Sequence, residues 1–160
     1  MRIAVMGAGS IGGYFGGKLS QGGNEVTLIA RGAHLDAIRS RGLKIITDDS
    51  EFIVECKATD DPGQVGPVDL VLLTVKTYHN QEAVPAMLPM IGSNTTVLCL
   101  QNGIDSFEAA ARFHGGEKVL PGAAYIDGRL EGPGVVRQIG NDVEIVFGEP
   151  DGAESPRCEA

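Results

Sequence analysis

Residues 2–31, RIAVMGAGSIGGYFGGKLSQGGNEVTLIAR, decide the fold of this chain. They begin with an apolar run over residues 2–6, of the kind found in strands that are buried on both faces of a parallel sheet. A glycine-rich turn follows, then apolar residues at helical spacing, and residues 25–30 form a second strand-like run. Strand, turn, helix and strand within about 30 residues predict a βαβ unit with parallel strands.

The turn at residues 7–12 has the pattern GxGxxG and lies between the predicted strand and helix. In such a turn the first glycine permits a tight bend, the second lets a pyrophosphate approach the backbone, and the third lets the helix pack closely on the strand. The start of the helix adds free N–H groups and the positive end of its dipole. We therefore predict dinucleotide binding rather than a glycine-rich turn without a ligand. The predicted contacts come from Gly7, Ala8, Gly9, Ser10, Ile11 and Gly12.

Three further glycines, Gly13, Gly16 and Gly17, lie inside the predicted helix. Each is expected to destabilise the helix by about 1 kcal/mol relative to alanine. Their presence predicts that the helix packs closely against its neighbours.

The residue at the end of the second predicted strand indicates which dinucleotide is bound. An acidic side chain about 20 residues after the glycine turn would hydrogen-bond the ribose 2′-hydroxyl of NAD. This chain has Arg31 there, between Ala30 and Gly32. A guanidinium can make charge-assisted, often bidentate hydrogen bonds to the 2′-phosphate of NADP. The sequence therefore favours NADP over NAD, the alternative being that Arg31 is an ordinary surface arginine.

Polar residues follow two later strands at the point where each strand is expected to end. Lys76 comes directly after the buried run DLVLLTV, and Gln101, Asn102 and Gly103 follow TTVLCL. Ligands of parallel sheets bind outside the carboxyl ends of the strands. A lysine there can donate to ribose hydroxyls or a carboxylate, and an asparagine amide can donate and accept at once. The alternatives are a solvated lysine and an ordinary Asn-Gly turn.

The rest of the chain continues the alternation of strands and helices. We expect strands over 69–75, 95–100 and 118–125, helices over 33–41, 80–90 and 105–113, a loop over 60–67, and hairpins from 43–47 with 52–57 and from 135–139 with 143–147. These elements predict an α/β, Rossmann-like, doubly wound and mainly parallel sheet with helices on both faces. Residues 1–149 would form one domain, and residues 150–160 read as a disordered tail or the start of a linker.

The composition limits the classes of function. The chain has 160 residues with 13 basic and 21 acidic side chains, so neither nucleic acid nor an anionic membrane is expected as a partner. No segment approaches the ~20 apolar residues that cross a bilayer, and no signal peptide is recognised, so we expect a cytoplasmic protein. The cysteines and histidines show no metal-ligand spacing. We therefore expect no metal and no disulfide, with the two inner cysteines in the core and the histidines on the surface.

The chain resembles the N-terminal domain of the ketopantoate reductase (2-dehydropantoate 2-reductase) family over residues 1–149. The matching segments are RIAVMGAGSIGGYFGGKL at the start, Arg31, Val75-Lys76 after DLVLLTV, Gln101-Asn102-Gly103 after TTVLCL, residues 122–124, and residues 131–136. This ordered set of motifs is far more specific than the glycine turn alone.

The resemblance implies reduction of 2-dehydropantoate to pantoate with NADPH. By carry-over, Gly7 to Gly12 would bind the pyrophosphate and Arg31 the 2′-phosphate, while Lys76 and Asn102 would contact the ribose on the nicotinamide side. Asn102 would also lie near the substrate, and Gly128 near the cofactor. Family members are about twice as long, and their helical C-terminal domain supplies the proton-donating lysine. We therefore expect negligible activity from these residues alone, and possible self-association through a surface that this domain would cover.

Two other functions remain open. The chain could be the cofactor domain of another NADP-dependent oxidoreductase that acts on a different 2-oxo or 3-hydroxy acid. It could also be a non-catalytic nucleotide-binding or interaction module. In every enzymatic reading the partner is a small-molecule substrate.

Overall fold

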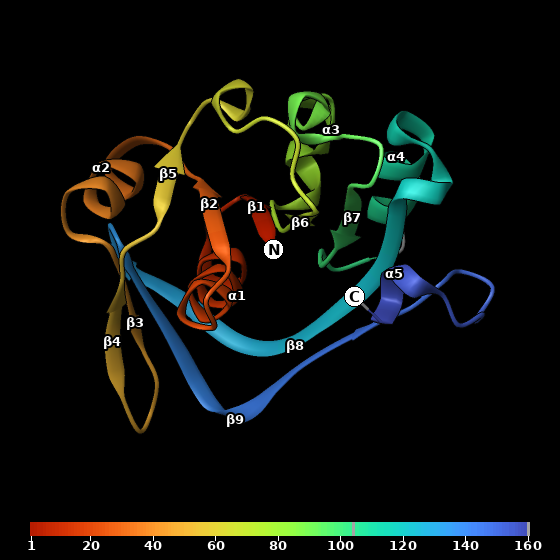
Figure 1. Ribbon diagram of the computed structural model, residues 1–160. Helices are drawn as coiled ribbons and strands as arrows, with labels where there is room; N and C mark the ends of the chain where they lie inside the picture. Colours follow the sequence, from red (N-terminus) through yellow and green to blue (C-terminus); the bar gives the residue numbers. More distant parts are fainter. Residues whose placement is uncertain (104, 160) are drawn as a thin grey trace.

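The computed structural model describes residues 1–103 and 105–159 (Figure 1). Its strands are β1 (Arg2–Met6), β2 (Glu25–Ile29), β3 (Leu43–Ile46), β4 (Glu51–Val54), β5 (Lys57–Thr59), β6 (Leu70–Leu73), β7 (Thr96–Cys99), β8 (Val119–Gly132) and β9 (Val135–Phe147). Its α-helices are α1 (Ser10–Gln21), α2 (Gly32–Arg41), α3 (Asn80–Ala86), α4 (Asp105–His114) and α5 (Pro156–Glu159). The opening βαβ unit of β1, α1 and β2 is confirmed.

The strands lie in the order β4-β3-β9-β8-β7-β6-β1-β2-β5. From β5 to the first residues of β8, every neighbouring pair of strands is parallel. The chain first moves outward from β1 to β2 and β5, and then returns to the other side of β1 with β6, β7 and β8. This order is that of a doubly wound fold, and the predicted fold class is confirmed. The reversal between β1 and β6 leaves a crevice at the carboxyl ends of these strands.

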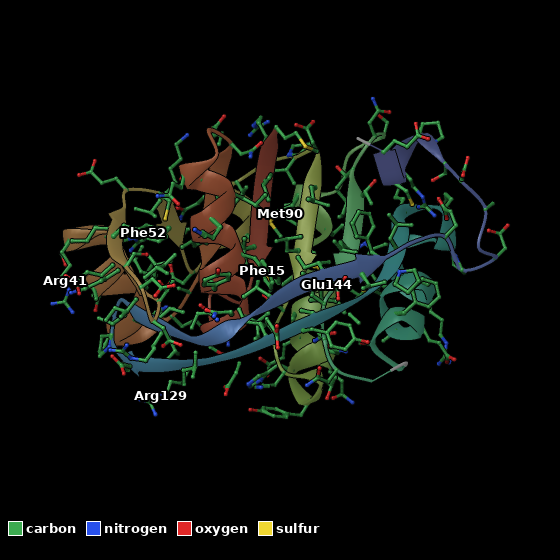
Figure 2. All side chains as sticks on the ribbon, turned by 90° about the horizontal axis from the view of Figure 1, so that it is seen from below. Phe15, Arg41, Phe52, Met90, Arg129 and Glu144 are labelled. Atoms are coloured by element: carbon green, nitrogen blue, oxygen red, sulfur yellow. The ribbon has the colours of Figure 1, made fainter. Side chains whose placement is uncertain are left out.

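Helix α1 lies between the parallel sheet and a second layer that consists of β3, β4, β9 and most of β8. Figure 1 shows β8 and β9 sweeping beneath α1, and Figure 2, seen from below, shows them crossing in front of it. A Cβ atom on Gly16 would lie 2.7 Å from Cδ2 of Leu28 in β2, and one on Gly17 would overlap Cδ1 of Ile45 in β3. The close packing predicted for α1 is confirmed, and it occurs on two opposite sides of the helix.

Buried apolar side chains cover both faces of the parallel sheet. One cluster joins β1 and β2 to α1, α2 and the second layer. The other cluster joins β6 and β7 to α3 and α4, and Met87 and Met90 at its centre are fully buried. Helices therefore cover both faces, as expected, and both clusters hold the carboxyl ends of the strands in fixed positions.

The closing hairpin expected within residues 135–147 is wrong. These residues form one strand, β9, which pairs antiparallel with a β8 that continues to Gly132. The segment between Ile139 and Glu144 interrupts this pairing, and Gly140 within it has φ +76°. A glycine with positive φ suits a bulge as well as a turn. Because β8 offers a continuous partner to both halves of β9, the bulge forms and the chain does not reverse.

The predicted strand over 52–57 divides into two. Residues 51–54 form β4 and pair antiparallel with β3, so the expected first hairpin is confirmed. Residues 57–59 form β5, which pairs parallel with β2 at the opposite edge of the sheet. The sequence does not mark this division, because Glu55 and Cys56 are neither glycine nor proline.

The end of the chain folds back onto the domain. Residues 156–159 form the short helix α5, and not the disordered end that the composition allows as one alternative. Arg157 donates to both carboxylate oxygens of Glu149 and to the carbonyl oxygen of Glu117. Ser155 donates a further hydrogen bond to Glu149. These hydrogen bonds hold the pKa of the Glu149 carboxyl at about 2, well below its usual range.

Candidate functional site

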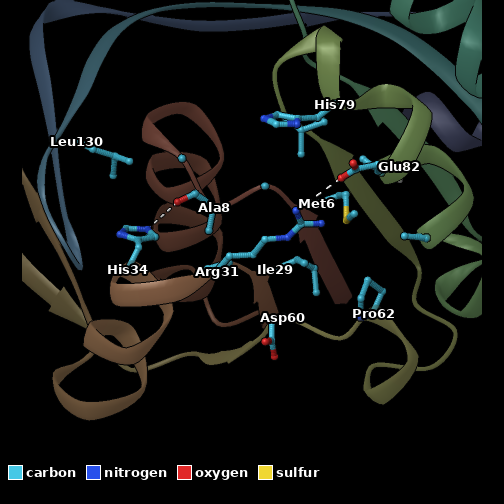
Figure 3. Close-up of a pocket in the computed structure, with 16 residues that line it drawn as sticks. Met6, Ala8, Ile29, Arg31, His34, Asp60, Pro62, His79, Glu82 and Leu130 are labelled. Carbon is cyan, nitrogen blue, oxygen red and sulfur yellow. Dashed lines mark hydrogen bonds and ion pairs between the residues drawn. The ribbon is translucent and has the colours of Figure 1, made fainter.

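Two cavities lie at the carboxyl ends of the parallel strands, on either side of the glycine turn. The first, here called the Arg31 cavity, has a volume of about 250 Å³ and is drawn in Figure 3. The second, the Lys76 cavity, has a volume of about 340 Å³. Val75 lines both cavities, so they lie on the two sides of one crevice. This is the position at which a doubly wound sheet binds its ligands.

The glycine turn places the first amides of α1 at the opening between the two cavities. The turn is closed by a hydrogen bond from the Gly9 amide to the Gly7 carbonyl, at 2.8 Å. The Gly13 amide donates to the Gly9 carbonyl at 2.8 Å and begins the hydrogen bonding of α1. Within the described residues, the amides of Ser10, Ile11 and Gly12 have no acceptor. They form the usual N-terminal set of free donors, which suits a phosphate group.

The three glycines of the motif have different surroundings. Gly7 has φ +104°, a value that favours glycine, and a Cβ atom there would lie 2.6 Å from Cγ1 of Val75. A Cβ atom on Gly12 would overlap the Gly7 carbonyl oxygen. Around Gly9, in contrast, no described residue other than its chain neighbours lies within 4 Å of where a Cβ atom would be. Packing therefore requires glycine at the first and third positions, while at the second position glycine leaves open space in front of the turn.

Two side chains hold the turn by its carbonyl groups. The Thr74 hydroxyl, just after β6, donates to the Gly7 carbonyl at 2.8 Å. His34 on α2 accepts a hydrogen bond from the Gly134 amide at Nδ1, at 2.9 Å, so its proton is on Nε2. That Nε2 lies 2.7 Å from the Ala8 carbonyl and donates to it, as the dashed line in Figure 3 shows. His34 thus connects the turn to the loop between β8 and β9.

Arg31, the residue predicted to bind the 2′-phosphate, lines the first cavity. It is the N-cap residue of α2, and its side chain extends toward α3 (Figure 3). Its Nη1 lies 3.7 Å from Oε2 of Glu82. The guanidinium therefore faces the crevice, with a carboxylate on the opposite wall. Glu82 has no signal in the sequence, because the position of α3 on the sheet decides which of its residues face this wall.

The remaining predicted residues come together around the second cavity. Lys76 follows β6, Asn102 follows β7, and Gly128 lies in β8 opposite Ser10 at the start of α1. Lys76 and Asn102 are exposed, and their side chains have no hydrogen-bond partner within the described part of the chain. A Cβ atom on Gly128 would lie 3.8 Å from that of Ser10. The fold thus places donors from two strands and a narrow β8 wall beside the amides of α1.

Gln101, the neighbour of Asn102, has a different role. Its side chain is 7% exposed, and its Nε2 donates to the Val75 carbonyl and, at 2.7 Å, to Oδ1 of Asn80. Gln101 therefore joins the end of β7 to the segment that carries Lys76. Its buried position leaves Asn102 as the residue of this pair whose amide reaches the cavity.

Two of the three histidines are not surface residues, contrary to the prediction. His114 is buried, with its Nε2 lying 2.9 Å from the Val84 carbonyl, and burial lowers the pKa of its imidazole. His34 is half-buried between the glycine turn and Gly134. Both lie on helices whose packing partners are distant in sequence, so the polar sequence around them gave no indication of burial.

The two inner cysteines are packing residues, as expected: Cys99 is buried in the core, and Cys56 is half-buried and packs against it. Burial raises the pKa of the Cys56 thiol to about 11 and that of the Cys99 thiol to about 12. Among residues 1–103 and 105–159, no cluster of side chains could hold a metal ion, and no helix is long and apolar enough to cross a membrane.

A family model described as ketopantoate reductase PanE/ApbA matches residues 3–152. The chain belongs to the ketopantoate reductase family. Among relatives of this family, the 2-dehydropantoate 2-reductase of Pyrococcus abyssi is 35% identical over an alignment that covers 96% of this chain and 50% of that protein. A crystal structure of 2-dehydropantoate 2-reductase from Geobacter metallireducens has a TM-score of 0.93 and 33% identity, covering 99% of this chain and 52% of the other.

A second kind of solved structure is also similar to this ketopantoate reductase family member. A D-mandelate dehydrogenase in a ternary structure with NADH and anilino(oxo)acetate has a TM-score of 0.82 and 33% identity, covering 91% of this chain and 48% of the other. The chain spans about half the length of the curated relatives it matches.

Proposed function

We propose that these residues are the NADPH-binding half of a 2-dehydropantoate 2-reductase, which reduces ketopantoate to pantoate. The observation that carries the proposal is the open space in front of Gly9. In the part of the chain that the structure describes, nothing beyond the adjoining residues lies within 4 Å of a Cβ atom at this position, although both other glycines of the motif are enclosed by packing. The free amides at the start of α1 border that space, and a cavity lies on each side of it. This arrangement fits a dinucleotide that lies across the turn with its pyrophosphate at Gly9.

The two cavities fit the two halves of NADPH. The Arg31 cavity offers apolar walls from Ile29, Pro62 and Ala86 to an adenine ring. In the same cavity Arg31 provides a guanidinium, which can bind the 2′-phosphate through two hydrogen bonds. The Lys76 cavity would then hold the nicotinamide half, with Gly128 leaving room at the β8 wall.

The chain's own side chains position the reacting groups in this scheme. When bound, the dinucleotide supplies the hydride for ketone reduction. The Lys76 ammonium and the Asn102 amide come from neighbouring strand ends and can donate hydrogen bonds to ribose hydroxyls. Asn102 also lines a third cavity of about 700 Å³, beside Tyr125 and Phe147, so it can contact a 2-oxo acid as well as the cofactor.

We further propose that the 160 residues are inactive alone. Ketone reduction needs a general acid that protonates the oxygen as hydride arrives. In this proposal the acid belongs to the half of the family's length that this chain does not span. The third cavity borders exposed apolar side chains, Tyr125, Val146 and Phe147, which are 58%, 51% and 44% exposed. Self-association of the isolated chain through this face is part of the proposal.

A second candidate is an NADH-dependent reductase of another 2-oxo acid. Two observations favour it. The similar D-mandelate dehydrogenase was solved with NADH, and the carboxylate of Glu82 lies beside Arg31 in this chain. A carboxylate in that region suits a ribose hydroxyl better than a phosphate.

The test is a fluorescence titration of the 160-residue chain with NADPH and, in parallel, with NADH. We expect saturable binding with a lower Kd for NADPH, and we expect Arg31→Ala to abolish most of the difference. Equal affinities in the wild type would favour the NADH-dependent reductase. Absence of binding by either dinucleotide would refute the cofactor proposal and favour a non-catalytic module. Adding 2-dehydropantoate to the NADPH complex should produce no oxidation of the cofactor by the isolated chain.

A further inference from the structure

The Arg31 cavity contains a pair of opposite charges that the proposed function leaves unexplained. Nη1 of Arg31 lies 3.7 Å from Oε2 of Glu82, across the cavity from α2 to α3 (Figure 3). The two side chains are 69% and 71% exposed. An ion pair this exposed contributes little to folding, because water screens it and both side chains lose freedom. Stability of the domain is therefore a poor explanation for an acid at this position.

The cavity has more negative than permanently positive side chains, which is unusual for a site that binds a phosphate. Among its described lining residues, Arg31 is the one with a permanent positive charge, while Asp60 and Glu82 carry carboxylates. Oδ1 of Asp60 lies 3.9 Å from Nη2 of Arg39 in α2, and this second arginine offsets the charge of Asp60. Glu82, in contrast, has Arg31 itself as its partner. The group that must bind a 2′-phosphate is thus already paired with a carboxylate.

This pairing acts against a phosphorylated ligand in two ways. Arg31 must exchange the Glu82 carboxylate for the phosphate, so part of the guanidinium's attraction is lost in breaking the existing pair. The Glu82 carboxylate then lies close to a group of nearly two negative charges, and the repulsion weakens binding. A ligand with a neutral 2′-hydroxyl does not require Arg31 to leave Glu82, and the Glu82 carboxylate does not repel it.

We propose that Glu82 is a specificity-determining residue that lowers the preference of this site for NADPH over NADH. The inference rests on the proposed function, since it assumes that the Arg31 cavity holds the adenosine end of a dinucleotide. It assigns Glu82 no part in the chemical step. It leads us to expect modest rather than strict selection of the phosphorylated cofactor, although an arginine stands at the end of β2.

The test compares Glu82→Gln with the wild type in titrations with NADPH and NADH. We expect the Kd for NADPH to fall about five-fold and the Kd for NADH to stay within two-fold, because the substitution removes one charge and keeps the shape. The gain should shrink as salt is raised from 50 to 500 mM, since screening weakens exposed charges. In the Arg31→Ala background the gain should be smaller, because no ion pair remains to be broken.

Glu108→Gln is the matched control. Glu108 is an exposed glutamate on α4 that pairs with Arg112 at 2.7 Å, and it lines none of the three cavities described above. The substitution changes the net charge by the same amount, so a general electrostatic effect would lower the NADPH Kd of both variants equally.

Three results would overturn the inference. If NADPH binds in an Arg31-dependent way and Glu82→Gln leaves both Kd values unchanged, the assignment of Glu82 is wrong while the proposed function stands. If Glu82→Gln and Glu108→Gln tighten NADPH equally, the effect is one of net charge and Glu82 has no special role. Failure of the wild type to bind either dinucleotide would remove the proposed function and this inference together.

Discussion

The sharpest test of the site is the substitution Gly9→Ala. Gly9 has φ −71°, a value open to any residue, and a Cβ atom there meets nothing within 4 Å. Alanine is a poorer N-cap than glycine, which opposes folding by about 0.5–1 kcal/mol. It also restricts the unfolded chain, which favours folding by about 0.4–1 kcal/mol. The two effects are of similar size, so we expect the free energy of unfolding to change by less than about 1 kcal/mol.

The effect on binding should be much larger. The methyl group would enter the space in front of the free amides of Ser10 and Ile11, where we place the pyrophosphate. Losing one or two hydrogen bonds to a charged group weakens binding by about 1.5–3 kcal/mol each. We therefore expect the Kd for NADPH to rise about 10-fold if one hydrogen bond is lost and more than about 100-fold if both are lost, since each factor of ten corresponds to about 1.4 kcal/mol.

The assay combines urea unfolding with NADPH titration on two comparison variants. Gly116 lies outside the crevice, and within the described residues a Cβ atom there also meets nothing within 4 Å, so Gly116→Ala should leave NADPH binding unchanged and raise the free energy of unfolding by no more than about 1 kcal/mol. Gly12→Ala should lower both the stability and the affinity for NADPH, because its Cβ atom would overlap the Gly7 carbonyl oxygen and overpacking destabilises a protein by about 1–3 kcal/mol. The reasoning would be refuted if folded Gly9→Ala bound NADPH as tightly as the wild type.

Three further predictions concern the hydrogen bonds, the helix packing and an ion pair that stabilise the domain. His34→Phe removes the hydrogen bonds to Ala8 and Gly134. We expect the Kd for NADPH to rise about ten-fold and the free energy of unfolding to fall by about 1–3 kcal/mol. A destabilised variant that still binds NADPH with the wild-type Kd would argue against a positioning role for His34. Gly17→Ala should destabilise α1 by about 1–3 kcal/mol despite alanine's better helix propensity, and Ile45→Val, which removes the overlapped Cδ1, should restore part of the loss in urea unfolding. Glu149 has a folded-state pKa of about 2, below its unfolded value near 4.5, so its ion pair stabilises fully above pH 4.5 and is lost as pH falls toward 2. The stability difference between wild type and Arg157→Ala should accordingly be largest near neutral pH and shrink at pH 3, and a difference independent of pH would contradict this assignment.

The local sequence pattern was sufficient to predict the opening βαβ unit. Residues 2–31 contain a strand signal, a glycine turn, a helical period and a second strand within the length of one crossover, and each signal depends on neighbours a few residues away. The same is true of the residues at the carboxyl ends of strands. Because parallel strands end at one edge of the sheet, Arg31, Lys76 and Asn102 could be assigned to one crevice before their distances were known.

Beyond the opening βαβ unit, the course of several strands depended on pairing between segments that are distant in sequence. Gly140 and its polar neighbours satisfy the local rules for a turn, yet β8 pairs with β9 on both sides of them. Likewise, β4 and β5 join opposite edges of the sheet although they are separated by only Glu55 and Cys56. Strand pairing is decided by which partner is available, and that partner is remote in sequence.

The sequence by itself determined the strand-turn-helix unit, the fold class and the residues at the mouth of the crevice, since those follow from spacing along the chain. Only the tertiary structure decided that α1 is enclosed between two layers, that His34 holds the turn, and that Glu82 faces Arg31. Each of these contacts joins elements whose relative position is fixed by packing of the whole domain, and packing has no local signature in the sequence.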